Sequence, residues 1–387
     1  MSVTAPRGFV AGGMHAGIRR DAKDLALVRS TAPALGAAMF TANRVQAAPV
    51  VVSKSHLAEA EPQAVVINSG VANAATGVRG ELDALATAAE AGRLLDLDAE
   101  EVLVLSTGVI GTLLPLERLL GGLRALAPTL SGDGGADAAE AILTTDTHAK
   151  QAAVSTAGFT VGGMAKGSGM IHPQLATMLA VVTTDYPLEL GEAGDFLRPA
   201  VERSFNSISV DGECSTNDAV VLLANGTSAV PRTPASDEAF ARALQEVCAR
   251  LAEQIVADGE GATVLAEIAV HGAVDGEQAR AIASRIATSS LVKTALFGRD
   301  ANWGRVLAAA GSAPFDGGFA EIEPSRVTLA YNGTVVLAEG VPQALEPQLS
   351  NGHCRIELDL GLGEGSASYL TSDLSYDYVR INADYRT

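Results

Sequence analysis

The residue of this chain best placed to act as a nucleophile is Thr177. Thr177 follows a glycine-rich stretch that contains Lys166 and ends near Pro173. The apolar run Met178 to Val182 comes directly after Thr177. That run has the length and composition of a buried strand entered through a loop. A hydroxyl at such a junction is held by the strand while its loop side opens to a cleft. The alternative is that Thr177 is an ordinary β-branched residue at a strand start.

Other catalytic motifs are absent from the sequence. The segment GGMAKGSG (162–169) matches neither the P-loop nor the GxGxxG pattern, and no GxSxG elbow occurs. Of six scattered histidines only His172 lies near Thr177, and we interpret it as a loop residue with ordinary hydrogen bonds. The carboxylates of Asp211, Glu213 and Asp218 lack the spacing of a calcium loop, so we predict an acidic, solvated turn there.

A threonine needs a base before it can attack a carbonyl. Cleavage of the Ala176–Thr177 bond would supply one, because the new α-amine of Thr177 would titrate at about 7.7–8.0. The attacked carbonyl also needs donors for its oxyanion. Thr107 and Gly108, in the turn STGVIG after a strongly apolar run, offer a hydroxyl and a backbone N–H. A plain strand-terminating turn is the alternative interpretation of this pair.

Composition limits the classes of partner. The chain has 387 residues, of which 48% are hydrophobic, and a formal charge of −18. That is a globular composition, and its charge disfavours nucleic acid and anionic membranes as partners. Three distant cysteines predict neither a disulfide framework nor a zinc site, which suits the cytoplasm. We expect no metal, no signal peptide and no membrane-spanning segment.

The order of expected elements predicts an α/β fold. Residues 1–78 are predicted as strands and turns, after which helices and strands alternate as far as a long helix over 237–259. From about residue 266 the pattern changes to α+β, with a strand predicted at 378–381. We therefore expect a catalytic α/β region over 1–265 and a smaller α+β domain over 266–387.

The stretch KGSGMIHPQLATML resembles the cleavage-site motif of the ornithine acetyltransferase (glutamate N-acetyltransferase, ArgJ) family. Further blocks resemble the same family, in family order and over nearly the whole chain. They are FTANRVQAAPV, VVINSGVANAATG, LSTGVIG, LTTDTHAK, STNDAVVLLANG, DGEGAT, LVKTALFGRDANWGRV and YVRINADYRT. The resemblance departs only slightly at Gln174 and Leu175, where Asn and Met are common in the family, and at Glu213-Cys214.

The resemblance implies a layered α/β sandwich shared with self-processing aminopeptidases. It implies autoproteolysis between Ala176 and Thr177 into an α chain, 1–176, and a β chain, 177–387, commonly as an α2β2 assembly. Thr177 would be the nucleophile, with Thr107 and Gly108 as the oxyanion hole. The positions implied to contact substrate are Thr144, Lys166, Thr177, Glu260, Asn382 and Thr387.

The activity implied is acetyl transfer from N2-acetyl-L-ornithine to L-glutamate in arginine biosynthesis, by a ping-pong route without a cofactor. Lys166 is the natural partner for a substrate carboxylate, and Glu260 suits the ornithine ammonium. The sequence leaves open whether acetyl-CoA is also a donor, as in a multifunctional enzyme, and whether the chain is a paralogue from clavulanic-acid pathways. A self-processing amidase or aminopeptidase using the same threonine is the alternative activity, and a non-catalytic binding protein is a third class.

Overall fold

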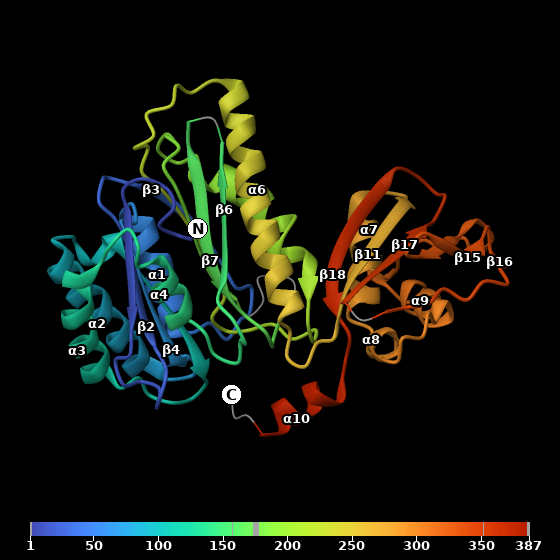
Figure 1. The fold of residues 1–387 in the computed structure, drawn as a ribbon, viewed down its shortest axis with the longest axis horizontal. Helices are drawn as coiled ribbons and strands as arrows, with labels where there is room; N and C mark the ends of the chain where they lie inside the picture. The colour runs from blue at the N-terminus through green and yellow to red at the C-terminus, as the bar shows by residue number, and fades with distance from the viewer. Residues whose placement is uncertain (1, 157, 173–177, 351, 385–387) are drawn as a thin grey trace.

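The computed structural model describes residues 2–156, 158–172, 178–350 and 352–384, so Ala176, Thr177 and Thr387 lie outside the described part. Within it, two sheets stack face to face, helices cover their outer faces, and a third sheet lies to one side (Figure 1). The predicted fold class, a layered α/β sandwich with an α+β region toward the C-terminus, is confirmed.

The first sheet of the sandwich has the order β1-β2-β4-β5, with β4 and β5 parallel. Its strands are β1 (Phe9–Met14), β2 (Leu25–Ser30), β4 (Ala64–Val71) and β5 (Val102–Val109). Helices α1 (Ala48–Glu59), α2 (Gly77–Leu95) and α3 (Leu116–Leu126) accompany it. Leu25 and Leu27 of β2 pack toward α2 and α3, whereas the alternate residues Ala26 and Val28 face the second sheet.

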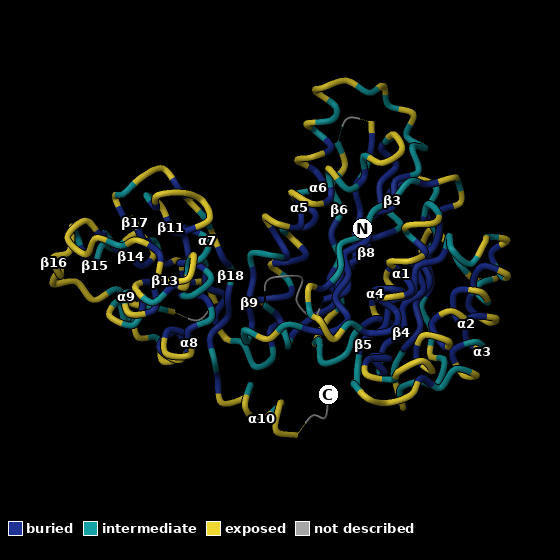
Figure 2. Tube along the Cα trace, turned by 180° about the vertical axis from the view of Figure 1, so that it is seen from behind, coloured by how far each residue is buried: buried dark blue, intermediate teal, exposed yellow. Residues whose placement is uncertain are grey.

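The second sheet has the order β3-β10-β8-β7-β6, with β8 and β10 parallel at its centre. Its strands are β3 (Leu35–Phe40), β6 (Lys150–Ser155), β7 (Thr160–Lys166), β8 (Leu179–Thr184) and β10 (Ala219–Ala224). Helices α5 (Ala193–Glu202) and α6 (Pro234–Ala257) cover its outer face. Its inner face meets the first sheet in one apolar core, to which α4 (Gly135–Ala141) also contributes. Figure 2 shows these strands buried and the outer helices exposed on one side.

Helix α6 illustrates how sequence specifies an element here. Its apolar stripe is fully buried, as predicted, and consists of Phe240, Leu244, Val247, Leu251 and Ile255. The helix begins three residues before the predicted start, because the Thr233 side chain accepts the Ser236 N–H at 3.1 Å and Pro234 occupies the first turn. This long helix closes the outer face of the sheet that carries β7 and β8.

The third sheet has the order β16-β15-β14-β17-β11-β18-β9. Its strands are β9 (Ile208–Ser209), β11 (Val264–Ala273), β14 (Thr328–Tyr331), β15 (Thr334–Ala338), β16 (Val341–Pro342), β17 (Gly352–Asp359) and β18 (Gly365–Ser372). Helices α7 (Gly276–Ala287), α8 (Ser290–Phe297) and α9 (Trp303–Ala310) lie with it, as does the hairpin β12 (Pro314–Phe315) and β13 (Gly318–Phe319). Short 3-10 helices lie at Ala99–Glu101, Ala127–Thr129, Phe205–Ser207 and Pro324–Arg326. Because β9 precedes residue 266 and pairs with β18, the boundary at 266 stays a prediction.

Two secondary-structure predictions are wrong. Residues 1–78 contain helix α1, which has Pro49 in its first turn and packs on β5, so tertiary contact overrides its valine-rich sequence. Residues 378–381 belong to a helix, α10 (Tyr376–Asp384), and not to a strand. Helix α10 leaves the third sheet after β18 and returns below the sandwich (Figure 1). That return brings C-terminal residues to the catalytic region.

Candidate active site

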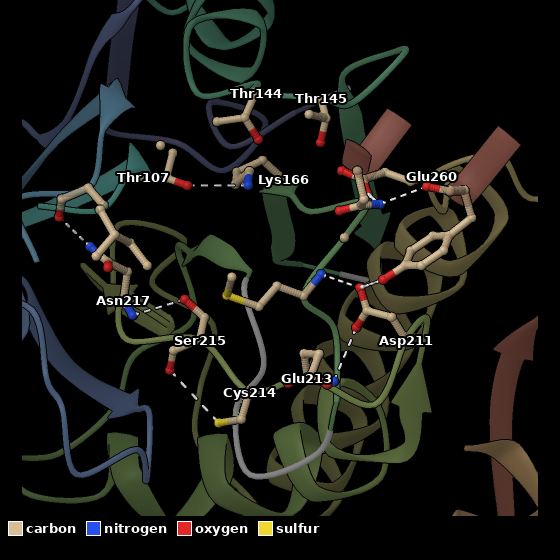
Figure 3. A pocket seen from close by; sticks show the side chains of 17 residues that line it. Thr107, Thr144, Thr145, Lys166, Asp211, Glu213, Cys214, Ser215, Asn217 and Glu260 are labelled. Carbon is tan, nitrogen blue, oxygen red and sulfur yellow. Dashed lines mark hydrogen bonds between the residues drawn. The ribbon is translucent and has the colours of Figure 1, made fainter. Parts of the chain in front are cut away.

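A cavity of about 200 Å³ lies where β5, β7 and α10 converge (Figure 3). It gathers the predicted site residues that the structure describes. They are Thr107, Gly108, Thr144, Lys166, Glu260 and Asn382. The predicted residues Ala176, Thr177 and Thr387 lie outside the described part. Residues more than 270 positions apart in the sequence, from Thr107 to Asn382, thus meet in one pocket.

The predicted oxyanion pair sits at the end of β5. Thr107 is buried, and Gly108 adopts a φ of +130°, a conformation that L side chains rarely take. A Cβ at position 108 would lie 2.3 Å from the carbonyl carbon of Gly70 on β4, where the register of the β4–β5 pair shifts. Glycine is therefore required at 108, and β5 is followed by a turn at residues 110–111 beside the cavity.

Lys166 is the cation of the cavity. It is the last residue of β7 rather than part of a turn, and 2% of it is exposed. Its Nζ donates to Thr107 Oγ1 at 3.3 Å. Burial lowers the pKa of Lys166, and the charge of Asp146 opposes that shift. A buried ammonium beside the oxyanion pair is suited to an incoming carboxylate.

A buried ion network holds two walls of the cavity. Lys150, with no exposed side-chain surface, donates to Asp146 at 2.7 Å and to Asp258 at 2.6 Å. Asp146 also accepts the Thr144 and Gly167 N–H groups, at 3.0 and 2.6 Å. Burial alone would raise the pKa of Asp146, but Lys166 and Lys150 together hold it below its ordinary range. Helix α4 ends at Ala141, so this network, and not a helix, positions Thr144.

We predict that Lys150→Met destabilises the fold by about 3–5 kcal/mol, because it leaves two buried carboxylates without their cation. Urea unfolding measures the loss. The matched control is Lys23→Met, which removes the Asp137 and Glu140 pairs of a partly exposed lysine and is expected to cost at most about 1 kcal/mol. Equal losses of unfolding free energy in the two variants would show that the buried network stabilises the fold no more than the partly exposed ion pairs do.

Glu260 forms the wall opposite Thr107. Its Oε2 accepts from Asn382 Nδ2 of α10 at 2.7 Å, and its backbone N–H donates to Ser168 O at 2.8 Å. A Cβ on Gly169 would lie 2.5 Å from the Glu260 carboxyl carbon, so glycine at 169 permits this approach. The cavity consequently has a cationic end at Lys166 and an anionic end at Glu260.

The prediction of a solvated acidic turn at 211–218 is wrong for two of its carboxylates. Asp218 is fully buried, and Asp211 is partly buried at the cavity wall. Asp211 accepts hydrogen bonds from Met170 N–H, Ile171 N–H and the Tyr378 hydroxyl. Asp218 accepts the Met178 N–H at 3.1 Å. Sequence reasoning missed them because a run of charges normally faces water; the clue was that Asp218 directly precedes the apolar strand β10.

No group of three or more His, Cys, Asp or Glu side chains placed to hold a metal ion occurs among the described residues. In the same part of the chain, no helix is both long enough and apolar enough to span a bilayer. Among the described residues, the polar lining of the cavity comprises hydroxyl groups, the amides of Asn217 and Asn382, the Cys214 thiol, Lys166 and carboxylates.

Comparison with known proteins places this chain in a family. The family model described as "ArgJ family" matches residues 10–387. The chain belongs to the ArgJ family. The arginine biosynthesis bifunctional protein ArgJ of Symbiobacterium thermophilum is 48% identical over 400 residues, covering 100% of this chain and 98% of that protein. The ArgJ protein of Mycolicibacterium paratuberculosis is 48% identical over 398 residues, covering 99% and 96%.

Among solved structures, the chain is similar to an ornithine acetyltransferase complexed with ornithine from Mycobacterium tuberculosis. The sequence identity is 45%, the match covers 44% of this chain and 94% of that chain, and the TM-score is 0.43. The family membership rests on the full-length sequence matches. It confirms the resemblance drawn from the sequence blocks.

Proposed function

We propose that this ArgJ-family chain transfers the acetyl group of N2-acetyl-L-ornithine to L-glutamate in arginine biosynthesis, after cleaving itself before Thr177. The observation that carries the proposal is the single cavity that joins Thr107, Gly108, Lys166 and Glu260. Met178, the residue after Thr177, is buried and hydrogen-bonded to Asp218 close to this cavity. The names of the full-length relatives, which state arginine biosynthesis, support the proposed pathway.

Self-cleavage comes first. The Thr177 hydroxyl attacks the carbonyl carbon of residue 176, the C–N bond breaks, and an ester with a free α-amine results. Water then hydrolyses the ester, which leaves a carboxylate on residue 176 and an N-terminal threonine. The products are an α chain, 1–176, and a β chain, 177–387, which we propose stay together in an α2β2 assembly in the cytoplasm.

Acetyl transfer uses the same hydroxyl. Thr177 Oγ attacks the acetyl carbonyl of acetylornithine while its own α-amine accepts the hydroxyl proton. Thr107 and Gly108 donate to the tetrahedral oxyanion, the α-amine returns the proton to the leaving nitrogen, and ornithine departs. Glutamate then attacks the acetyl-threonine ester by the reverse path. The kinetics are ping-pong, and the chemistry needs neither a cofactor nor a metal.

Substrate charges fit the two ends of the cavity. Both amino acids carry an α-carboxylate for Lys166, and ornithine carries a second ammonium for Glu260. The hydroxyl of Thr144, at the rim held by Asp146, and the amide of Asn382 provide further polar contacts. Thr387 is proposed as a contact on the resemblance alone.

We expect Lys166→Met to raise KM for both amino acids by about tenfold or more, because a charged hydrogen bond is lost. In the unchanged enzyme, KM for glutamate should rise toward alkaline pH. The sign follows from the lowered pKa of Lys166: its ammonium loses its proton at a lower pH than an exposed lysine does, and the carboxylate loses its partner. Initial rates across pH measure this, and an unchanged KM in Lys166→Met would rule out the carboxylate role.

A self-processing amidase would use the same nucleophile but pass the acetyl group to water. Incubation with acetylornithine, with and without glutamate, separates the two activities. Acetylglutamate formation that depends on glutamate supports the proposal, whereas acetate release at the same rate without glutamate identifies a hydrolase. Replacing acetylornithine by acetyl-CoA in this assay shows whether the chain also has the second activity that the word "bifunctional" in its relatives' names suggests.

A further inference from the structure

Two carboxylates of the loop 211–218 bind the backbone on both sides of the predicted cleavage bond. Asp211 Oδ2 accepts the Met170 N–H at 2.6 Å, and Asp211 Oδ1 accepts the Ile171 N–H at 2.9 Å. Asp218 Oδ1 accepts the Met178 N–H at 3.1 Å. The chain is thereby tied just before residue 172 and again at residue 178. Figure 3 shows Asp211 at the wall of the pocket with its hydrogen bonds.

The turn that Asp211 holds is strained. Met170 has a φ of +58°, in the left-handed region that a residue with a side chain seldom occupies. Such a conformation persists only where its surroundings fix it. Asp211 supplies two of the fixing contacts, and the Tyr378 hydroxyl of α10, at 3.3 Å from Asp211 Oδ2, orients the carboxylate. Tyr378 thus links helix α10 to the segment that leads toward the cleavage bond.

The second contact lies at the start of β8. Asp218 is fully buried, and its backbone carbonyl accepts the Thr41 N–H at 3.0 Å, which fixes the residue against the neighbouring strand. Met178 O in turn accepts the Ala219 N–H at 3.2 Å. Residues 218 and 219 therefore bind both the N–H and the carbonyl oxygen of Met178. Because residue 177 is bonded directly to Met178, Asp218 is anchored one residue from the hydroxyl and amine that the reaction uses.

Asp218 is fully buried and Asp211 is partly buried, and burial raises the pKa of each carboxyl above its ordinary value. Removing these carboxylates from water costs free energy, and a solvent-exposed turn would not incur that cost. Their contacts with the backbone N–H groups of residues 170, 171 and 178 offset that cost at the points where the chain enters and leaves the cleavage segment.

We propose that Asp211 and Asp218 are positioning residues for self-cleavage, a carboxylate clamp that holds the backbone on either side of residues 172–177. Fixing the backbone at residues 170–171 and at residue 178 reduces the entropy lost when the Thr177 hydroxyl meets the carbonyl of residue 176. It rests on the proposed function, because it has a purpose only if the chain cleaves itself there.

The test compares cleavage rates of variants made by cell-free synthesis, with intact-mass spectrometry following the 177–387 fragment over time. Asp211→Asn turns one acceptor oxygen into an NH2 group that faces a backbone donor, and cleavage should slow by about 10- to 100-fold. Asp218→Ala removes the Met178 contact and should slow cleavage by about tenfold. Asp218→Asn keeps an oxygen for the Met178 N–H, so it should cleave within about threefold of wild type.

The matched control is Asp185→Asn, at the opposite end of β8. Asp185 is buried, and its two oxygens accept the Thr160 and Arg7 N–H groups at 2.7 and 3.3 Å. It should lose a similar amount of thermal stability to Asp211→Asn but cleave at the wild-type rate. If Asp218→Ala does not fold, the isosteric variant Asp211→Asn still tests the clamp. Tyr378→Phe removes only the hydroxyl that orients Asp211 and should slow cleavage by about threefold.

Each outcome decides a separate point. Wild-type cleavage rates in both Asp211→Asn and Asp218→Ala would overturn the clamp while leaving the proposed function intact. Equally slow cleavage in Asp218→Asn and Asp218→Ala would show that Asp218 acts by charge and not by position. If Asp185→Asn also cleaved slowly, loss of stability alone would explain the slow cleavage of the Asp211 and Asp218 variants, and the clamp would be overturned. A wild-type chain that stays whole would instead overturn the proposed function itself.

Discussion

Thr177→Ala should remain a single chain of 387 residues and transfer no acetyl group from acetylornithine to glutamate. The variant lacks the hydroxyl that attacks residue 176, so the α-amine that serves as base never forms. Removing the nucleophile of a covalent mechanism usually lowers kcat by at least about 10⁴-fold. Intact mass reports the cleavage and a glutamate-dependent assay reports the transfer, both on the same sample.

Thr177→Ser is the control, because it keeps a hydroxyl at the same position. It should cleave and turn over, more slowly than wild type but far above Thr177→Ala. If Thr177→Ala cleaved at the wild-type rate, the bond would be cut by another nucleophile or by a contaminating protease. If it stayed whole and yet transferred acetyl groups, Thr177 would not carry the acetyl group.

Thr107→Val should lower kcat for acetyl transfer by about 10²- to 10³-fold, the usual effect of losing one oxyanion donor. Valine matches threonine in shape, so the buried site at the end of β5 stays filled. The loss should fall on kcat more than on KM, because the oxyanion forms only in the transition state. Lys166 also loses the hydroxyl that now lies 3.3 Å from its Nζ. Steady-state kinetics on fully cleaved protein measure both constants.

Thr87→Val is the matched control for this change. Thr87 is a buried threonine of α2 that donates to Asp83 O at 2.7 Å and is not among the residues that line the cavity. Its replacement should affect stability and leave kcat unchanged. If Thr107→Val kept kcat within about threefold of wild type, Thr107 would not be an oxyanion donor, and its contact with Lys166 would be structural.

Much of the fold followed from hydrophobic pattern. The apolar runs at 102–108 and 178–182 became β5 and β8, and the stripe of α6 is buried as predicted. These elements are long or strongly apolar, so their local preference agrees with their tertiary setting. Helices α1 and α10 were missed because their sequences contain β-branched residues, and only packing on β5 and contact with the cavity decide their conformation.

The site was predicted less by chemistry than by resemblance. The residues around Thr107 and Gly108, taken alone, favoured a plain strand-terminating turn. Only the φ of Gly108 and its approach to Gly70 show a special geometry. The ion network of Lys150 could not be foreseen, because its partners Asp146 and Asp258 are brought together by the fold. Asp211 and Asp218 were assigned to solvent because burial of a carboxylate depends on backbone partners that a sequence does not reveal.

The central claim is that Thr177 carries the acetyl group, and one measurement tests it directly. The protein is incubated with N2-acetyl-L-ornithine in the absence of glutamate, quenched in acid, digested and mapped by mass spectrometry. We predict one acetyl group on the peptide that begins at Thr177, attached through the side-chain oxygen and lost when glutamate is added. An acetyl group on any other residue, or none on this peptide while acetylglutamate still forms, would contradict the account.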